Sequence, residues 1–330
     1  MIELDGDQLL FTFPEVHEDA TLAVAFMRTL RIPDDGRSYP LPPGLGRFPL
    51  RDIDAHARTV TKGWLEQGGA MLPMYQSEAL WLRFEPYLLP AHRTSYPFAI
   101  KVAAGTINAV TGDAFDRTLH EKPQDYVVAP KQPWLDGWCV EKGLIRQFVA
   151  MPLGQGYTAE EQITGKSVHG GIQLAAYPMK RDVFERRFPK SRIIDTFFGG
   201  RATPPVPPGS VLSADMGLAA GGRMRQEIFE DPYELADWDQ AHGTSIFVRI
   251  ADSLSWQRIT GSPPPTQPPS AKDYARARLP WFEYYDDGKA LGGADKLDDL
   301  ASVGDKESVD VEAHVRKLRA GFGKKQVRDS

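Results

Sequence analysis

One stretch of the sequence, residues 134–180, holds most of the side chains that could carry chemistry. It contains the only cysteine, Cys139, together with Glu160, Glu161 and His169. A thiol, an imidazole and a carboxylate are the residue types that acyl transfer requires, with the thiolate as nucleophile and the histidine as base. Cys139, His169, Glu160 and Glu161 are therefore the candidate catalytic residues of a hydrolase or transferase.

The alternative is that Cys139 has a packing role. It stands between Trp138 and Val140, two bulky apolar residues, and a free cysteine most often behaves as a small buried hydrophobe. Asp136 could replace Glu160 as the carboxylate of a catalytic set. Packing is the more common fate, so we expect Cys139 to be buried.

A glycine motif in the same stretch has the form of a dinucleotide-binding loop. Residues 154–159 read G-x-G-x-x-A and follow an apolar run typical of a strand. The helix after it has room only from about Thr158 to Thr164 before Gly165, whereas a Rossmann crossover helix is longer and is followed by an acidic ribose ligand about 20 residues on. Position 180 is a lysine. The pattern favours a glycine-rich turn, and no cofactor is predicted.

Two tryptophans of this stretch are candidates for ligand binding. Trp134 and Trp138 flank Asp136-Gly137, a turn signal, so an exposed indole beside the carboxylate of Asp136 could stack on a ligand. Core packing is the competing interpretation for both indoles.

Metal-binding patterns are missing from the sequence. Its seven histidines show no two-residue or four-residue spacing and no HExxH motif, and one cysteine cannot build a thiolate cluster. We predict no metal site.

The elements that would position these groups are mostly strands. Apolar residues alternate with polar or small ones over several short runs, the period of a half-buried strand. Glycine and proline turn signals separate the runs at short intervals, which is typical of a sandwich or barrel. The sequence predicts a mainly β fold, a β-sandwich or barrel-like body with a few short helices. The clearest inward faces are Leu9/Phe11/Phe13, Leu22/Val24/Phe26/Leu30/Ile32, Phe98/Ile100/Val102, Ile172/Leu174/Ala176 and Ile246/Val248/Ile250. The best helix candidates are 181–188, 251–258 and 271–278.

Composition divides the chain at about residue 285. Residues 1–285 should form the β-rich globular body, as one domain or as two packed lobes. Residues 286–330 are rich in charge and glycine and poor in large apolar side chains, which predicts a flexible C-terminal tail. Three proline-rich stretches, 39–44, 203–209 and 262–269, are interpreted as rigid loops, with a PxxP ligand for an SH3-like partner as the alternative.

Charge and targeting features limit the class of partner. The formal net charge is −5, which argues against a nucleic-acid partner. The N-terminal residues lack a secretory pattern, and the longest apolar stretch, interrupted by Lys101 and Asn108, falls short of the ~20 residues that cross a bilayer. We expect a soluble, cytoplasmic protein with no membrane partner.

The block WLDG, RQFVAMPLGQGYTAEEQITG and GGIQL resembles an uncharacterised family of microbial proteins, some of them labelled "integral membrane protein". The runs MLPMYQSEALWLRF and AIKVAAGTINAVTG upstream, and MGLAAGGRMRQEIFED downstream, belong to the same pattern. The resemblance would cover most of residues 20–285. It implies no activity, substrate or catalytic residue, and its membrane label conflicts with the missing spanning segment.

Three functional hypotheses follow. The first is a binding or assembly protein that holds a protein partner with its loops or a sheet face, because rigid β scaffolds with Gly/Pro loops suit recognition. The second is the hydrolase or transferase with a site assembled from 134–180. The third is a structural subunit of a homo-oligomer, in which self-association pairs exposed strand edges.

Overall fold

The computed structural model describes residues 1–32, 38–39, 42, 44–76, 78–190 and 216–267. The predicted boundary at residue 285, the tail 286–330 and the predicted helix 271–278 lie outside these residues. The description below concerns the described residues alone.

The protein is mainly β, as the sequence predicts. Its strands are β1 (Ile2–Asp5), β2 (Gln8–Thr12), β3 (Thr21–Thr29), β4 (Ser38–Tyr39), β5 (Gly44–Arg47), β6 (Arg51–Asp52), β7 (Ala70–Pro73), β8 (Ala79–Pro86), β9 (Leu88–Leu89), β10 (Thr94–Ser95), β11 (Phe98–Ala104), β12 (Ile107–Asn108), β13 (Val127–Ala129), β14 (Trp134–Leu135), β15 (Gly137–Glu141), β16 (Leu144–Pro152), β17 (Ile172–Pro178), β18 (Met216–Arg225) and β19 (Thr244–Ala251). Its α-helices are α1 (Lys62–Gln67), α2 (Ala159–Thr164), α3 (Arg181–Arg187) and α4 (Ser253–Thr260).

Two groups of strands build the body. The first runs in the order β1-β2-β3-β8-β16-β18 and is antiparallel. The second runs β6-β7-β19-β17-β11-β13 and is antiparallel except for the parallel pair β7–β19. Met216 at the start of β18 pairs with Ile250 of β19 and joins the two groups into one continuous sheet.

The core lies where the two groups face each other. The inward residues of β2, β3 and β8 and those of β11, β17 and β19 belong to one cluster of buried side chains. The ring of Phe13, the residue after β2, lies 5.7 Å from the ring of Phe98 in β11. The inward faces that the alternation predicts belong to this core, apart from Ile246, which is partly buried against it, and Leu30 and Ile32, which are buried outside this cluster. Period-2 alternation therefore identified buried residues in β2, β3, β11, β17 and β19, although β3, β11 and β17 are buried on both faces.

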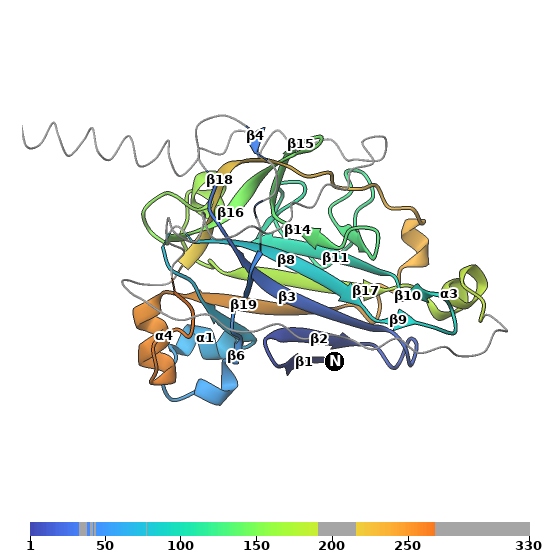
Figure 1. Ribbon diagram of the computed structural model, residues 1–330, viewed down its shortest axis with the longest axis horizontal. Coiled ribbons are helices and arrows are strands. Elements are labelled where there is room, and N and C mark those ends of the chain that lie inside the picture. Colours follow the sequence, from blue (N-terminus) through green and yellow to red (C-terminus); the bar gives the residue numbers. More distant parts are fainter. Residues whose placement is uncertain (33–37, 40–41, 43, 77, 191–215, 268–330) are drawn as a thin grey trace, which may run out of the picture.

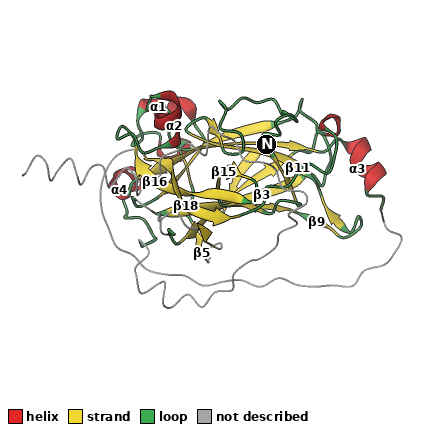
Figure 2. Cartoon of the chain, turned by 90° about the horizontal axis from the view of Figure 1, so that it is seen from above, coloured by secondary structure: helices red, strands yellow, loops and turns green. Residues whose placement is uncertain are grey.

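The helices are short and cover the two ends of the body. Helices α1 and α4 lie at one end, and α3 lies at the other (Figures 1 and 2). The predicted helix 181–188 is confirmed as α3. The predicted helix 251–258 begins two residues later, because Ala251 still pairs with Pro73 in the sheet and Asp252 accepts hydrogen bonds from the backbone N–H groups of Leu254 and Ser255 as the N-cap of α4. None of the helices in the described part of the chain is long and apolar enough to cross a membrane.

A buried ion pair lies under the proline-rich segment that follows α4. Two nitrogens of Arg28, Nε and an Nη, donate to Glu78 Oε1 at 2.9 and 2.7 Å, and both side chains are almost fully buried. Arg28 also donates to the carbonyl of Gln267, and the Tyr75 hydroxyl donates to the carbonyl of Thr266 at 2.7 Å. Residues 262–267 therefore lie against the body, as the rigid-loop interpretation expects; Pro268, the second proline of the PxxP pattern, lies outside the described residues.

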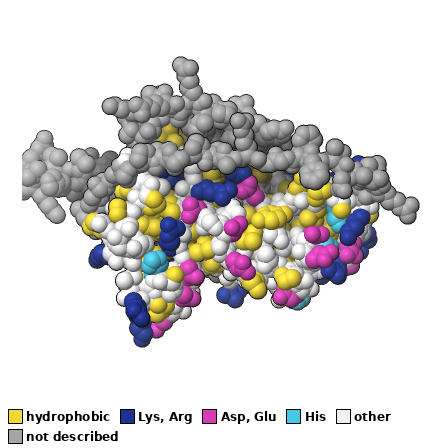
Figure 3. Space-filling model, turned by 60° about the horizontal axis from the view of Figure 1, so that its bottom comes forward, with side chains coloured by type: hydrophobic (Ala, Val, Ile, Leu, Met, Phe, Trp, Pro, Cys, Tyr) yellow, Lys and Arg dark blue, Asp and Glu magenta, His cyan; other side chains and the backbone are white. Residues whose placement is uncertain are grey.

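The surface shows no simple charge segregation on the face seen in Figure 3. Acidic and basic side chains are interspersed there among apolar and neutral ones. Any recognition site on this side depends on local pockets instead of a broad charged face.

Candidate functional site

Of the residues that the sequence proposed for catalysis, Cys139, Glu160 and Glu161 have side chains with structural roles, whereas His169 is half-buried and is held through its backbone N–H and carbonyl. Cys139 lies in β15 with 1% of its surface exposed. Burial, together with the negative charge of Glu227, raises the pKa of the Cys139 thiol to about 12. A nucleophilic cysteine needs solvent access and a lowered pKa. The expectation of a buried Cys139 is confirmed.

Glu160 fixes a loop. It is 2% exposed, at the start of α2. Its carboxylate accepts hydrogen bonds from the backbone N–H groups of Val168, His169 and Gly170, the last at 2.8 Å. The carbonyl of His169 in turn accepts from Arg249. These contacts attach the loop before β17 to helix α2.

Glu161 explains the glycine motif. Thr158 and Glu161 form a reciprocal capping box at the N-terminus of α2. Glu161 Oε1 also accepts the backbone N–H groups of Gly154 and Gly156, at 2.6 and 3.2 Å. Both glycines have positive φ, 84° and 75°, as a tight turn requires. The N–H groups that would bind a pyrophosphate in a Rossmann loop are bound here by the protein's own carboxylate.

The candidate ligand-binding residues of the same stretch are mostly buried. Trp138 is fully buried, and its ring packs edge-on against Phe148 at 5.2 Å. Trp134 is partly buried in β14. Asp136 is buried, and its carboxylate accepts a hydrogen bond from Gln226 at 2.8 Å. Burial raises the pKa of Asp136 to about 8, against the lowering effect of the hydrogen bonds from Gln226 and Trp134.

A different segment, the loop formed by residues 109–126, assembles a polar site. Both ends of this loop are attached to strand β11. At its start β12 pairs with the end of β11, and at its end β13 returns to pair Val127 with Ile100. Asn108 closes the turn at the start, because its side-chain oxygen accepts the N–H groups of Val110 and Thr111 while its amide donates to the carbonyl of Asp125 at 2.8 Å.

Lys101 reaches from β11 into this loop. Its side chain is 1% exposed, and its ammonium lies 2.7 Å from both Asp116 Oδ1 and Asp125 Oδ2. It also donates to the carbonyl of Thr118. A buried ammonium of this kind requires carboxylate partners, so Lys101 fixes the positions of both aspartates.

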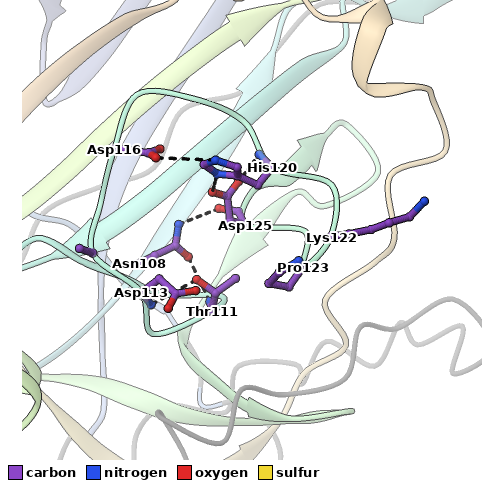
Figure 4. Close-up of a pocket in the computed structure, with 9 residues that line it drawn as sticks. Asn108, Thr111, Asp113, Asp116, His120, Lys122, Pro123 and Asp125 are labelled. Carbon is purple, nitrogen blue, oxygen red and sulfur yellow. Dashed lines mark hydrogen bonds and ion pairs between the residues drawn. The ribbon is translucent and has the colours of Figure 1, made fainter.

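His120 completes the cluster. Asp125 Oδ2 accepts from His120 Nδ1 at 2.8 Å, and Asp125 Oδ1 accepts the backbone N–H of His120. The other ring nitrogen, Nε2, lies 3.8 Å from Asp116 Oδ2 (Figure 4). Asp125 is nearly buried, whereas the side chains of Asp116 and His120 are about half exposed, at 53% and 48%.

These groups line a pocket of about 260 Å³. Asp113 and Thr111 belong to its wall, while Lys122 extends away from the cluster (Figure 4). Desolvation acts to raise the pKa of Asp116, but the hydrogen bonds from Lys101 and Thr118 outweigh it and hold that pKa below its ordinary value. The carboxylates of Asp113, Asp116 and Asp125 stand against the ammonium groups of Lys101 and Lys122, which leaves one net negative charge around the pocket. The pocket is therefore acidic.

The cluster also offers ligand atoms to a metal ion. One atom each from Asp116, His120 and Asp125 lie within 4.8 Å of one another, a grouping that histidine spacing alone did not reveal. The Lys101 ammonium, however, already contacts a carboxylate oxygen of each aspartate at 2.7 Å. The ammonium therefore already takes the position between Asp116 and Asp125 that a divalent cation would need.

Comparison of the chain with family models, with curated proteins and with solved structures found no match. The resemblance of the 134–174 block to a microbial family thus stays a prediction.

Proposed function

We propose that this protein is a binding protein that holds a partner protein by receiving one of its basic side chains in the pocket of loop 109–126. The observation that carries the proposal is the contact between Lys101 and the two aspartates. The pair Asp116 and Asp125 already binds an ammonium from inside the fold, and the half-exposed Asp116 lines the same pocket together with Asp113. Such a carboxylate pair suits a lysine or arginine head group.

The volume of the pocket suits a single side chain of a partner protein. Pockets for small-molecule ligands usually measure roughly 300–1,000 Å³, and this one is smaller, at about 260 Å³. A single ammonium or guanidinium with part of its aliphatic stem suits such a volume. Because the loop is attached to β11 at both ends, the carboxylates are held in place before the partner arrives, which reduces the entropy cost of binding.

We also propose that the protein is located in the cytoplasm. Its one buried thiol can form no internal disulfide, so the fold does not depend on an oxidising compartment.

The test uses three short peptides, Ac-Gly-X-Gly-amide with arginine, alanine or glutamate at X. We expect saturable binding of the arginine peptide alone, weakened by salt, and a loss of about tenfold or more in the double variant Asp113→Asn/Asp116→Asn. Equal binding of the arginine peptide by wild type and variant, or of all three peptides by wild type, would reject the proposal. Light scattering at several protein concentrations shows whether the basic side chain comes from a second copy of this chain.

One observation favours a second candidate, acid–base catalysis. With its Nδ1 hydrogen on Asp125, His120 has Nε2 as its basic nitrogen, 3.8 Å from Asp116 Oδ2 in the pocket lining, as in a general base held by a carboxylate. A hydrolase working this way would lose about 100-fold or more of its rate in His120→Ala. Identical hydrolysis of p-nitrophenyl acetate by the wild type and His120→Ala would exclude this candidate.

A further inference from the structure

A second, larger cavity lies at the end of the body where α1 and α4 are found. Its volume is about 540 Å³, inside the range of small-molecule sites. The walls come from the turn before α1, from α1 itself, from α4, and from the loops that follow β16 and α2. The protein thus brings together segments up to 200 residues apart, as the hydrogen bond from Thr59 Oγ1 to the carbonyl of Ile259 shows directly.

Part of the lining of this cavity is apolar and comes from Trp64, Leu153, Val168 and Ile259. The indole of Trp64 belongs to a small buried cluster with Trp256 and is held in place by it. Val168, by contrast, is 62% exposed at the cavity wall, although it is apolar. An apolar ligand group could cover Val168 and contact the buried cluster behind it.

The other lining residues carry hydroxyl or guanidinium groups, which can donate hydrogen bonds. Arg258 donates to Ser255 Oγ at 2.8 Å, which uses one of its five N–H groups and leaves the Ser255 hydroxyl hydrogen to donate. Thr61 Oγ1 accepts the N–H of Trp64 as the N-cap of α1, so its own hydrogen is also available. Ser167 adds a fourth donor-bearing side chain.

The charge of the lining has one sign. Of the residues that line the cavity, Arg258 is the only charged one, and none carries a carboxylate. Arg249 lies behind the indole, with its guanidinium 5.6 Å from the Trp64 ring. Asp252, the nearest acid along the chain to Ser255, directs Oδ1 to the backbone N–H groups at the start of α4. Donors and a positive charge beside apolar side chains suit a ligand that carries acceptors and negative charge on an apolar body.

We propose that this cavity is a binding site for a small organic anion, a molecule with a carboxylate or phosphate on an apolar, ring-bearing body. The anionic group contacts Arg258 and the hydroxyls of Ser255 and Thr61. The ring lies against Trp64, Leu153 and Val168. This site is separate in residues and in charge from the acidic pocket of loop 109–126 and does not rest on the function proposed for that pocket.

The test uses phenyl phosphate as the probe, with phenol and inorganic phosphate as half-probes that each lack one feature. We expect phenyl phosphate to bind more tightly than either in calorimetric titration and to raise the melting temperature of the full chain. Arg258→Gln should weaken phenyl phosphate about tenfold or more. Arg186→Gln, which removes an exposed arginine of α3 at the other end of the body, should leave binding unchanged.

A second variant guards against an effect of Arg258 on folding. Val168→Asp changes an exposed residue and places a negative charge on the cavity wall, so phenyl phosphate should again bind less tightly. The proposal is overturned if phenyl phosphate shows no saturable binding up to about 10 mM, where a site of even millimolar affinity is mostly filled. It is equally overturned if Arg258→Gln binds phenyl phosphate as the wild type does, or if inorganic phosphate binds as tightly as phenyl phosphate.

Discussion

Residues 134–180 and loop 109–126 contain similar titratable side chains and use them in opposite ways. In the first region Cys139, Asp136 and Glu160 are buried, and both carboxylates accept hydrogen bonds from the protein itself. In the second, Asp116 and His120 are about half exposed and face a pocket. The same residue types therefore hold the fold together in one region and remain open to a ligand in the other. What distinguishes a candidate site is unused hydrogen-bonding capacity with solvent access, and residue type alone does not show it.

The largest expected effect contrasts Glu160 with Asp116. Glu160→Ala leaves three backbone N–H groups of the loop 168–170 without their carboxylate, so we expect the free energy of unfolding to fall by about 3 kcal/mol. Asp116→Ala removes an exposed partner of Lys101 while Asp125 stays, and should cost about 1 kcal/mol or less. Urea unfolding of both variants measures the difference. A larger fall in the free energy of unfolding for Asp116→Ala than for Glu160→Ala would contradict the structural role of Glu160 and the open position of Asp116.

We expect Asp136 to make the free energy of unfolding fall as the pH rises. Its folded pKa of about 8 lies above its ordinary value of 3.8, so between these values the folded state keeps a proton that the unfolded state has released. The stabilisation is complete below pH 4 and is lost as the pH rises toward 8, at about 1 kcal/mol per pH unit. From pH 6 to 8 we expect the wild type to lose about 2 kcal/mol relative to Asp136→Asn. A constant difference between the two proteins over this range would show that Asp136 is ionised in the fold.

Cys139 should be protected and modestly stabilising. Because its thiol is buried and its pKa is raised, native alkylation by iodoacetamide at pH 7 should be slow, and fast once the chain is unfolded. Cys139→Ala removes a small buried side chain and should cost about 1–2 kcal/mol. Native alkylation faster than that of a free-thiol standard would refute the packing role and return Cys139 to the candidate nucleophiles.

The smallest effect belongs to Glu161. Glu161→Ala removes the acceptor of the glycine turn and half of the capping box, and we expect a loss of about 1 kcal/mol. Glu161→Gln keeps one side-chain oxygen and should lose less. Thermal unfolding of the pair is the measurement, and equal destabilisation by both variants would show that the negative charge, and not the hydrogen-bond acceptor, is what matters.

The strands could be predicted from the sequence and the site could not, for a physical reason. Alternation with period 2 is a local signal, so the inward faces of β2, β3, β11 and β17 follow from neighbouring residues. Helix α1 has only six residues, too few for a helical period to show. The local signals for it are the N-cap threonine, Thr61, and the C-cap glycine, Gly68.

The acidic pocket depends on contacts across the chain. Lys101 lies 15 residues from Asp116 and is brought to it by the return of the loop onto β11. The spacing of Asp116 and His120, four residues, would have suggested a shared helix face, yet the two lie in a loop. Residues 134–180 became the predicted site because many reactive residue types occur there. In the fold, Cys139, Asp136 and Glu160 of this stretch are buried.

The most direct test of the account follows backbone amide NMR shifts while the arginine peptide is titrated into the labelled protein. The account predicts saturable shifts in loop 109–126 and at Lys101, with residues 134–180 largely unmoved, and no such shifts with the alanine peptide. Saturable shifts confined to 134–180, or no saturable shift anywhere, would contradict the claim that the loop pocket is the recognition site.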